Sequence, residues 1–205
     1  MNRVGERKTR SDKKKDVKPL IKTEVKEAIQ RISHITFMPV KDVCEFLTVY
    51  AANDRDTLDK LTKFIRRSVR IGNTLYNGNS EAQPITKRFT DSREKVTIKF
   101  KRDDFERIST LAYAMDCTPT RATAIFLTQG VRNVGAVNAF VRQYLAEELS
   151  PRQIEELRQI LTYTHRYDND NHSWASVLSA IVGDVRPAMR SLREIVDEFI
   201  WEHKR

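Results

Sequence analysis

Apolar and polar side chains alternate strictly between residues 96 and 101. The apolar positions are Val96, Ile98 and Phe100. The polar positions are Thr97, Lys99 and Lys101. A period of two over residues that favour extended backbone predicts a half-buried β-strand. A single short strand leaves its edges unpaired, so this one needs a partner strand.

The period changes from two to between three and four directly after this strand. Apolar residues from Phe105 to Met115 recur at helical spacing, which predicts an amphipathic helix that starts near Asp103. A second helix is expected to follow, because Thr118 is a typical N-cap and Pro119 suits the first helical position. The chain from residue 95 therefore reads as a strand, a helix, a tight turn and a second helix.

This order of elements, together with the basic strand and the capped second helix, resembles the ribbon-helix-helix (MetJ/Arc-type) superfamily of DNA-binding proteins. The resemblance implies a mainly α fold in which two units pair their strands into a short two-stranded antiparallel β-ribbon. It also implies that the solvent face of the ribbon enters the DNA major groove. The matching stretch is residues 95–149, and the part that carries the motif covers about one fifth of the chain.

Residues 19–70 form a helical block that reads as a diverged first copy of the same unit. The alignment pairs Arg31 with Arg107, Pro39 with Pro119 and Phe64 with Phe140, and it needs a four-residue gap that is later reversed. The strand of this copy would lie near Leu20, where Pro19 cannot donate a ladder hydrogen bond. Two arrangements stay open: a ribbon within one chain, similar to TraY-type conjugation accessory proteins, or a ribbon between two chains.

The remaining segments differ sharply in composition. Residues 1–18 carry eight Lys or Arg against three acids and are expected to be a disordered basic arm. Residues 71–94 hold turn-forming residues without periodicity and are expected to be a linker. Residues 150–205 show three amphipathic helical stripes with eight basic against nine acidic residues. They predict a C-terminal helical bundle for oligomerisation or partner docking, or a cover for the core of the first part.

The net charge of +9 and the pI near 9.6 indicate a polyanionic partner. On the ribbon interpretation the side chains that contact DNA bases are Thr97, Lys99 and Lys101. The side chains that contact phosphates are Arg102, Thr118, Thr120, Arg121, Lys13, Lys14, Lys15, Lys18 and Lys22. The competing interpretation is that the strand residues are merely the polar face of a hairpin and that Thr118 is an ordinary cap.

The sequence gives little support for a catalytic, cofactor or metal site. We expect no enzymatic activity, since no phosphate-binding loop, dinucleotide fingerprint or nucleophile elbow occurs. We expect no cofactor and no metal: Asp168, Asp170 and His172 lack the glycine and glutamate of a calcium loop. A helix-turn-helix over residues 122–145 with Gly130 at its turn is a weaker alternative. Cys44 and Cys117 are expected to be reduced thiols in a cytoplasmic protein without a signal peptide or a membrane span.

The sequence thus predicts a sequence-specific double-stranded DNA-binding protein. It would act as a transcriptional repressor or as an accessory factor of plasmid or mobile-element transfer or partition. Residues 150–205 would supply a homodimer or higher-oligomer contact or a surface for a protein partner. The alternative is a helical protein-interaction module with non-specific affinity for RNA or DNA.

Overall fold

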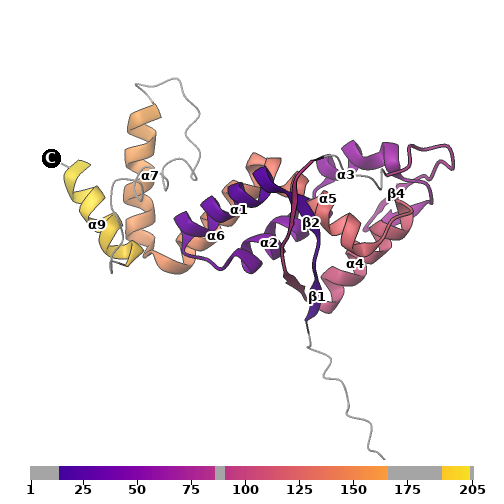
Figure 1. The fold of residues 1–205 in the computed structure, drawn as a ribbon. Coiled ribbons are helices and arrows are strands. Elements are labelled where there is room, and N and C mark those ends of the chain that lie inside the picture. The colour runs from indigo at the N-terminus through magenta and orange to yellow at the C-terminus, as the bar shows by residue number, and fades with distance from the viewer. Residues whose placement is uncertain (1–13, 86–90, 166–190, 204–205) are drawn as a thin grey trace, which may run out of the picture. The chain divides into compact units, whose positions relative to one another are not determined.

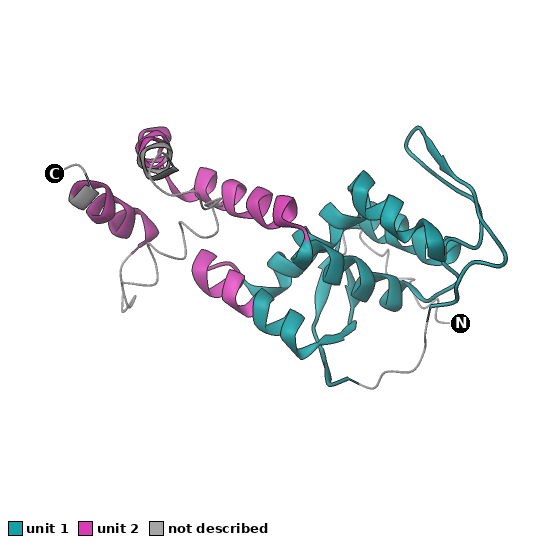
Figure 2. Cartoon of the chain, turned by 90° about the horizontal axis from the view of Figure 1, so that it is seen from above, with its two compact units in different colours: residues 1–29, 39–132 teal, residues 30–38, 133–205 magenta. Residues whose placement is uncertain are grey.

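The computed structural model describes residues 14–85, 91–165 and 191–203. The protein is mainly helical, with small two-stranded antiparallel sheets. The chain divides into two compact units (Figure 2): residues 1–29 with 39–132, and residues 30–38 with 133–205. The division falls inside the first helix, α1 (Thr23–Thr36).

The first unit is built around one antiparallel ribbon (Figure 1). Strand β1 (Lys15–Val17) pairs with β6 (Ile98–Phe100), and β2 (Leu20–Lys22) pairs with β5 (Arg93–Lys95). Both pairings share one register, and the Val96 amide donates to the Pro19 carbonyl between them at 3.2 Å. Because proline has no N–H, the return bond is missing at this point, which divides the ribbon into two short ladders.

Each strand of the ribbon leads into a pair of helices. The first half of this unit continues from β2 into α1 (Thr23–Thr36) and α2 (Val40–Asn53). The second half continues from β6 into α4 (Arg102–Ala114) and α5 (Pro119–Arg132). The strand, first helix and second helix predicted from residue 95 onward are confirmed, including the start of α5 at Pro119. The partner strand lies in the same chain.

The two halves correspond residue by residue at a constant separation of 79 positions. Phe37 and Asp116, which both have φ 53°, end α1 and α4 at this separation. Asp54 and Asn133, again 79 positions apart, each cap the helix that follows. The gapped alignment through Arg31, Pro39 and Phe64 is therefore wrong. It matched identical residue types, whereas the halves share their burial pattern and backbone conformation.

The core of the first unit lies under the ribbon and between its helices. The ribbon contributes Val17, Pro19, Ile21, Val96, Ile98 and Phe100. Helices α2 and α5 cross closely: a Cβ on Gly130 would lie 2.3 Å from the Leu47 carbonyl oxygen. Gly130 lies within α5, which runs on to Arg132. The helix-turn-helix alternative is therefore wrong, because it needs a turn at Gly130.

Between the two halves the chain forms α3 (Arg55–Leu61), a short 3-10 turn η1 (Thr62–Phe64) and a hairpin. The hairpin pairs β3 (Val69–Ile71) with β4 (Thr74–Tyr76). Gly72, at the first position of its two-residue turn, has φ 56°, a conformation that glycine adopts without steric cost. Residues 71–94 were expected to be a linker, but they hold part of this hairpin and all but the last residue of β5.

The second unit is helical in its described residues. It contains the end of α1, α6 (Val134–Glu148), α7 (Pro151–His165) and α9 (Leu192–His203). Two of these helices begin with reciprocal capping pairs. The Ser150 and Gln153 pair opens α7, and the Ser191 and Glu194 pair opens α9. The buried core of the unit includes Tyr144, Leu157 and Val196. Residues 166–190, where the second of the three helices predicted for residues 150–205 was expected, lie outside the described residues.

Candidate nucleic-acid interface

The outer face of the ribbon collects the side chains that alternate with the core residues. On the first strand these are Asp16, Lys18, Leu20 and Lys22. On the second strand they are Arg93, Lys95, Thr97 and Lys99. Five of these eight residues are basic and one is acidic. A polyanion facing this surface would therefore meet a net positive charge.

The register fixes which of these residues lie opposite each other. Asp16 faces Lys99, and Leu20 faces Lys95. The two ladders share one register, with the Val96–Pro19 hydrogen bond between them, and this register places Lys18 opposite Thr97. The outer face is thus two strands wide and holds four cross-strand pairs. A two-stranded ribbon of this width is one of the elements that the major groove of B-DNA admits.

The three side chains predicted as base contacts lie where the alternation placed them. Thr97, Lys99 and Lys101 are all exposed, and Lys101 immediately precedes α4. Lys99 lies 3.9 Å from Asp16, measured from Nζ to Oδ1, with both side chains about half exposed. The opposite strand also contributes side chains to this face, although no base contact is predicted there. The alternation of residues 16–22 could have revealed Asp16, Lys18 and Leu20, but Pro19 at its centre obscured it.

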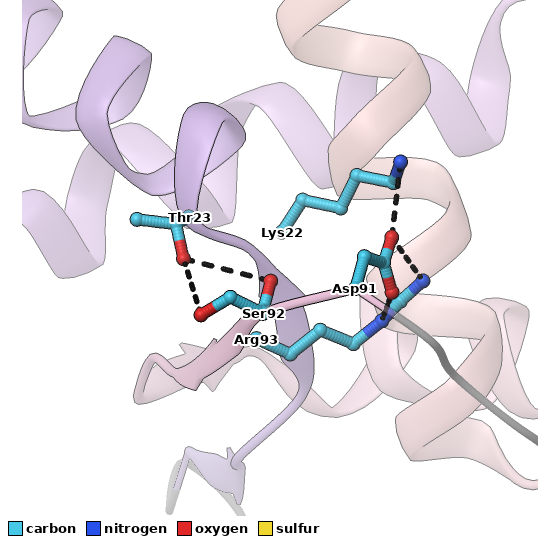
Figure 3. Close-up of polar contacts among 5 residues, drawn as sticks. All are labelled: Lys22, Thr23, Asp91, Ser92 and Arg93. Carbon is cyan, nitrogen blue, oxygen red and sulfur yellow. Dashed lines mark hydrogen bonds and ion pairs between the residues drawn. The ribbon is translucent and has the colours of Figure 1, made fainter.

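The ribbon is tied together at one end by a small charge cluster (Figure 3). The Asp91 carboxylate accepts from Lys22 Nζ at 2.9 Å and from Arg93 Nε at 2.8 Å. The hydrogen bond from Lys22, followed by the one from Arg93, lowers the pKa of Asp91 to about 2. Asp91 is therefore ionised at neutral pH and holds both basic side chains. The Thr23 hydroxyl donates to the Ser92 hydroxyl at 3.2 Å beside them.

The lysines predicted as phosphate contacts in the first strand have different surroundings. Lys14 forms an ion pair with Glu45 of α2 at 2.7 Å, and Lys15 is exposed. Lys18 and Lys22 lie on the outer face of the ribbon, so they belong with the base-contact candidates. Lys13 lies outside the described residues. The basic arm predicted to extend to residue 18 overlaps the ribbon, because β1 begins at Lys15.

The remaining phosphate candidates lie at helix starts in the second half. Arg102 opens α4 and donates to Glu106 one turn later at 2.8 Å. Thr118 caps α5 by accepting from the Arg121 amide at 3.2 Å, as predicted, while Thr120 is exposed. The Arg121 side chain is half-buried, and its burial, helped by the nearby charge of Arg93, lowers its pKa.

The two cysteines are free thiols; Cys44 is buried and Cys117 is half-buried. Burial raises the pKa of Cys44 to about 12 and the pKa of Cys117 to about 11. Both are therefore protonated at neutral pH, and a protonated thiol is a poor nucleophile and metal ligand. Among the described residues no three His, Cys, Asp or Glu side chains gather as a metal site would require. The Asp168–His172 stretch lies outside them.

The second unit carries a shallow groove of about 450 Å³ beside the start of α7. Its lining includes Arg152, Glu156, Arg193 and Asp197. Gln153 of α7 also lines this groove and donates to Asp197 of α9 at 2.7 Å. The lining carries both signs of charge, so it lacks the uniform basic character of the ribbon. Within the described part of the chain, no helix is both long enough and apolar enough to cross a membrane.

Comparison of the chain with protein-family models, with curated proteins and with solved structures found no match.

Proposed function

We propose that this protein binds double-stranded DNA and reads its sequence with the outer face of the ribbon, as a single-chain ribbon-helix-helix pseudo-dimer. The observation that carries the proposal is the basic outer face itself, in which Lys18, Lys95, Lys99 and Thr97 stand on one surface two strands wide. Such a surface fits the major groove, where lysine donates to guanine and threonine contacts several base edges.

Phosphate contacts would fix the ribbon in the groove. The start of α5 offers backbone N–H groups together with Thr118 and Thr120, and Arg102 stands at the start of α4. In the first half, the 79-residue correspondence places Lys41 at the position of Thr120, and Lys41 is also exposed. Helix starts bind phosphate through their free amides and the positive end of the helix dipole. These contacts set the position of the protein but carry no sequence information.

The biological role that this activity serves is repression of transcription or an accessory step in transfer or partition of a mobile element. Both roles need a protein that finds one short duplex among many. Specific DNA binders achieve this with affinities roughly 10³–10⁷-fold tighter for the target than for other sequences.

The test is selection of duplexes from a random library by the full chain at a fixed salt concentration. A defined sequence should emerge, and Lys99→Ala should then reduce discrimination at one base pair by roughly 1–3 kcal/mol. Lys60→Ala is the matched control, because Lys60 is an exposed lysine on α3 and belongs to neither strand of the ribbon. It should leave the preference unchanged.

Two results would overturn this proposal. The first is a selected duplex that binds no more tightly than random duplex or structured RNA, which would favour a helical interaction module with non-specific affinity. The second is that Lys99→Ala and Thr97→Ala both bind the selected duplex as the parent does.

Deletion of residues 1–13, which leaves β1 intact, should weaken binding to all duplexes and reduce the dependence on salt.

A further inference from the structure

We propose that the DNA site is asymmetric, with a different base pattern on each side of its centre. This inference rests on the proposed function and adds the kind of duplex that would be bound. A ribbon made from two identical chains presents the same side chains to both halves of its site. Here the two strands belong to one chain and carry different outer residues. The two halves of the DNA site can therefore meet different side chains.

The centre of the ribbon can be located from the repeat. Residues 79 positions apart occupy equivalent places in the two halves, and Lys18 and Thr97 are such a pair. They also lie opposite each other in the ladder. An approximate twofold axis therefore passes between them. The residues on either side of it are the ones that would meet the two halves of the DNA site.

The sides of this axis differ in their chemistry. On one side Asp16 faces Lys99, with the carboxylate and the amine 3.9 Å apart and both about half exposed. On the other side Leu20 faces Lys95, and Leu20 is 38% exposed. The twofold operation places Lys95 where Asp16 stands and Leu20 where Lys99 stands. One side thus presents a carboxylate and an amine, while the other presents an amine and an alkyl group.

These side chains suit different base edges in the major groove. A carboxylate accepts from the cytosine amino group, and a lysine beside it donates to the acceptors of guanine. The Asp16–Lys99 side therefore suits a step in which cytosine and guanine edges lie next to each other. An alkyl side chain contacts the thymine methyl group, so the Leu20–Lys95 side suits a thymine next to a guanine.

The experiment compares three duplexes of equal length with the full chain. One is the duplex selected from a random library, and the other two are palindromes that each repeat one of its halves. We expect each palindrome to bind at least roughly tenfold more weakly than the selected duplex, since one mismatched half suffices for that loss. Equal binding to a palindrome, or a palindromic selected duplex, would overturn this inference while leaving the proposed function intact.

A double variant tests the residues themselves. Asp16→Lys combined with Lys99→Leu gives the first side the same chemistry as the second, with the same strand arrangement. It should prefer the palindrome built from the Leu20–Lys95 half over the selected duplex, reversing the parent preference by about tenfold or more. A parent-like order of preference would overturn the inference. If no duplex is selected over random sequence, the proposed function fails together with it.

Discussion

The two strand-helix-helix halves of the first unit share their inner face and differ on their outer face. The inward positions Val17 and Val96, and likewise Ile21 and Phe100, are apolar and buried in both halves. The equivalent outward positions pair Asp16 with Lys95 and Leu20 with Lys99. Close packing favours apolar side chains at these buried positions, whereas no such requirement acts on the outer face. The two halves are thus similar in the residues of their inner face and different in the residues of their outer face.

The halves also lead into different elements. Asp54 caps α3 of seven residues, which leads into the hairpin, whereas Asn133 caps α6 of fifteen residues in the second unit. Both caps use a short side-chain oxygen that accepts from the amide three residues later. The same type of N-cap therefore begins two helices of different length. The cap is part of the repeated unit, whereas the length of the helix that follows it is not.

The largest expected effect is at the equivalent core positions Ile21 and Phe100, both fully buried. Phe100→Ala should reduce the free energy of unfolding by about 3–5 kcal/mol, and Ile21→Ala by about 2–5 kcal/mol. If the two halves support one common core, the two losses should be similar and unfolding should stay a single transition. Denaturant titration followed by circular dichroism measures both, and a variant that unfolds only one half in a separate step would contradict the shared core.

A smaller effect is expected where α2 and α5 cross. Gly130→Ala would place a Cβ 2.3 Å from the Leu47 carbonyl oxygen, so the helices must separate. We expect a loss of about 1–3 kcal/mol from this overpacking, although alanine favours helix. Ala51→Gly, at the equivalent position of α2, is the matched control and should cost about 1 kcal/mol through helix propensity. Unchanged or increased stability of Gly130→Ala in the same denaturant titration would rule out the close crossing.

The smallest effect concerns the left-handed residues that end α1 and α4. Phe37 has φ 53° and is 46% exposed, a conformation that is unfavourable for a bulky side chain. Phe37→Asn should therefore stabilise the protein by about 0.5–1 kcal/mol, because asparagine tolerates this region. Asp116→Asn starts from a residue that already tolerates it and would weaken the ion pair with Arg67, so no gain is expected. Thermal unfolding of both variants makes the comparison, and equal shifts would argue against backbone strain at Phe37.

Local patterns in the sequence were sufficient to predict the second strand-helix-helix half of the first unit. The alternation at residues 96–101, the helical spacing after Phe105 and the Thr118–Pro119 start all depend on neighbours in sequence, and they fixed the outward direction of Thr97, Lys99 and Lys101. The partner strand near Leu20 was predicted only from the comparison of residues 19–70 with the second half, and not from its own alternation. Its pairing joins residues more than seventy positions apart, and Pro19 sits at its centre without a donor.

Gly130 and the hairpin show a second reason why predictions from the sequence were wrong. The glycine predicted to mark a turn lies inside a helix, because its lack of a side chain serves the contact with Leu47 and not the backbone conformation. Likewise, the turn residues near Gly72 were interpreted as part of a linker, although they close a tight hairpin. In both places the sequence identified an unusual residue, and only the tertiary contact shows what that residue does.

The pairing of both ribbon strands within one chain has a consequence for how the ribbon responds to dilution. Strands on separate chains assemble by a second-order process, so their folded fraction falls as the protein becomes scarce. Here Asp16 and Lys99 meet in an intramolecular step whose effective concentration is set by the connecting residues. The ribbon therefore forms to the same extent at a few copies per cell as at high abundance.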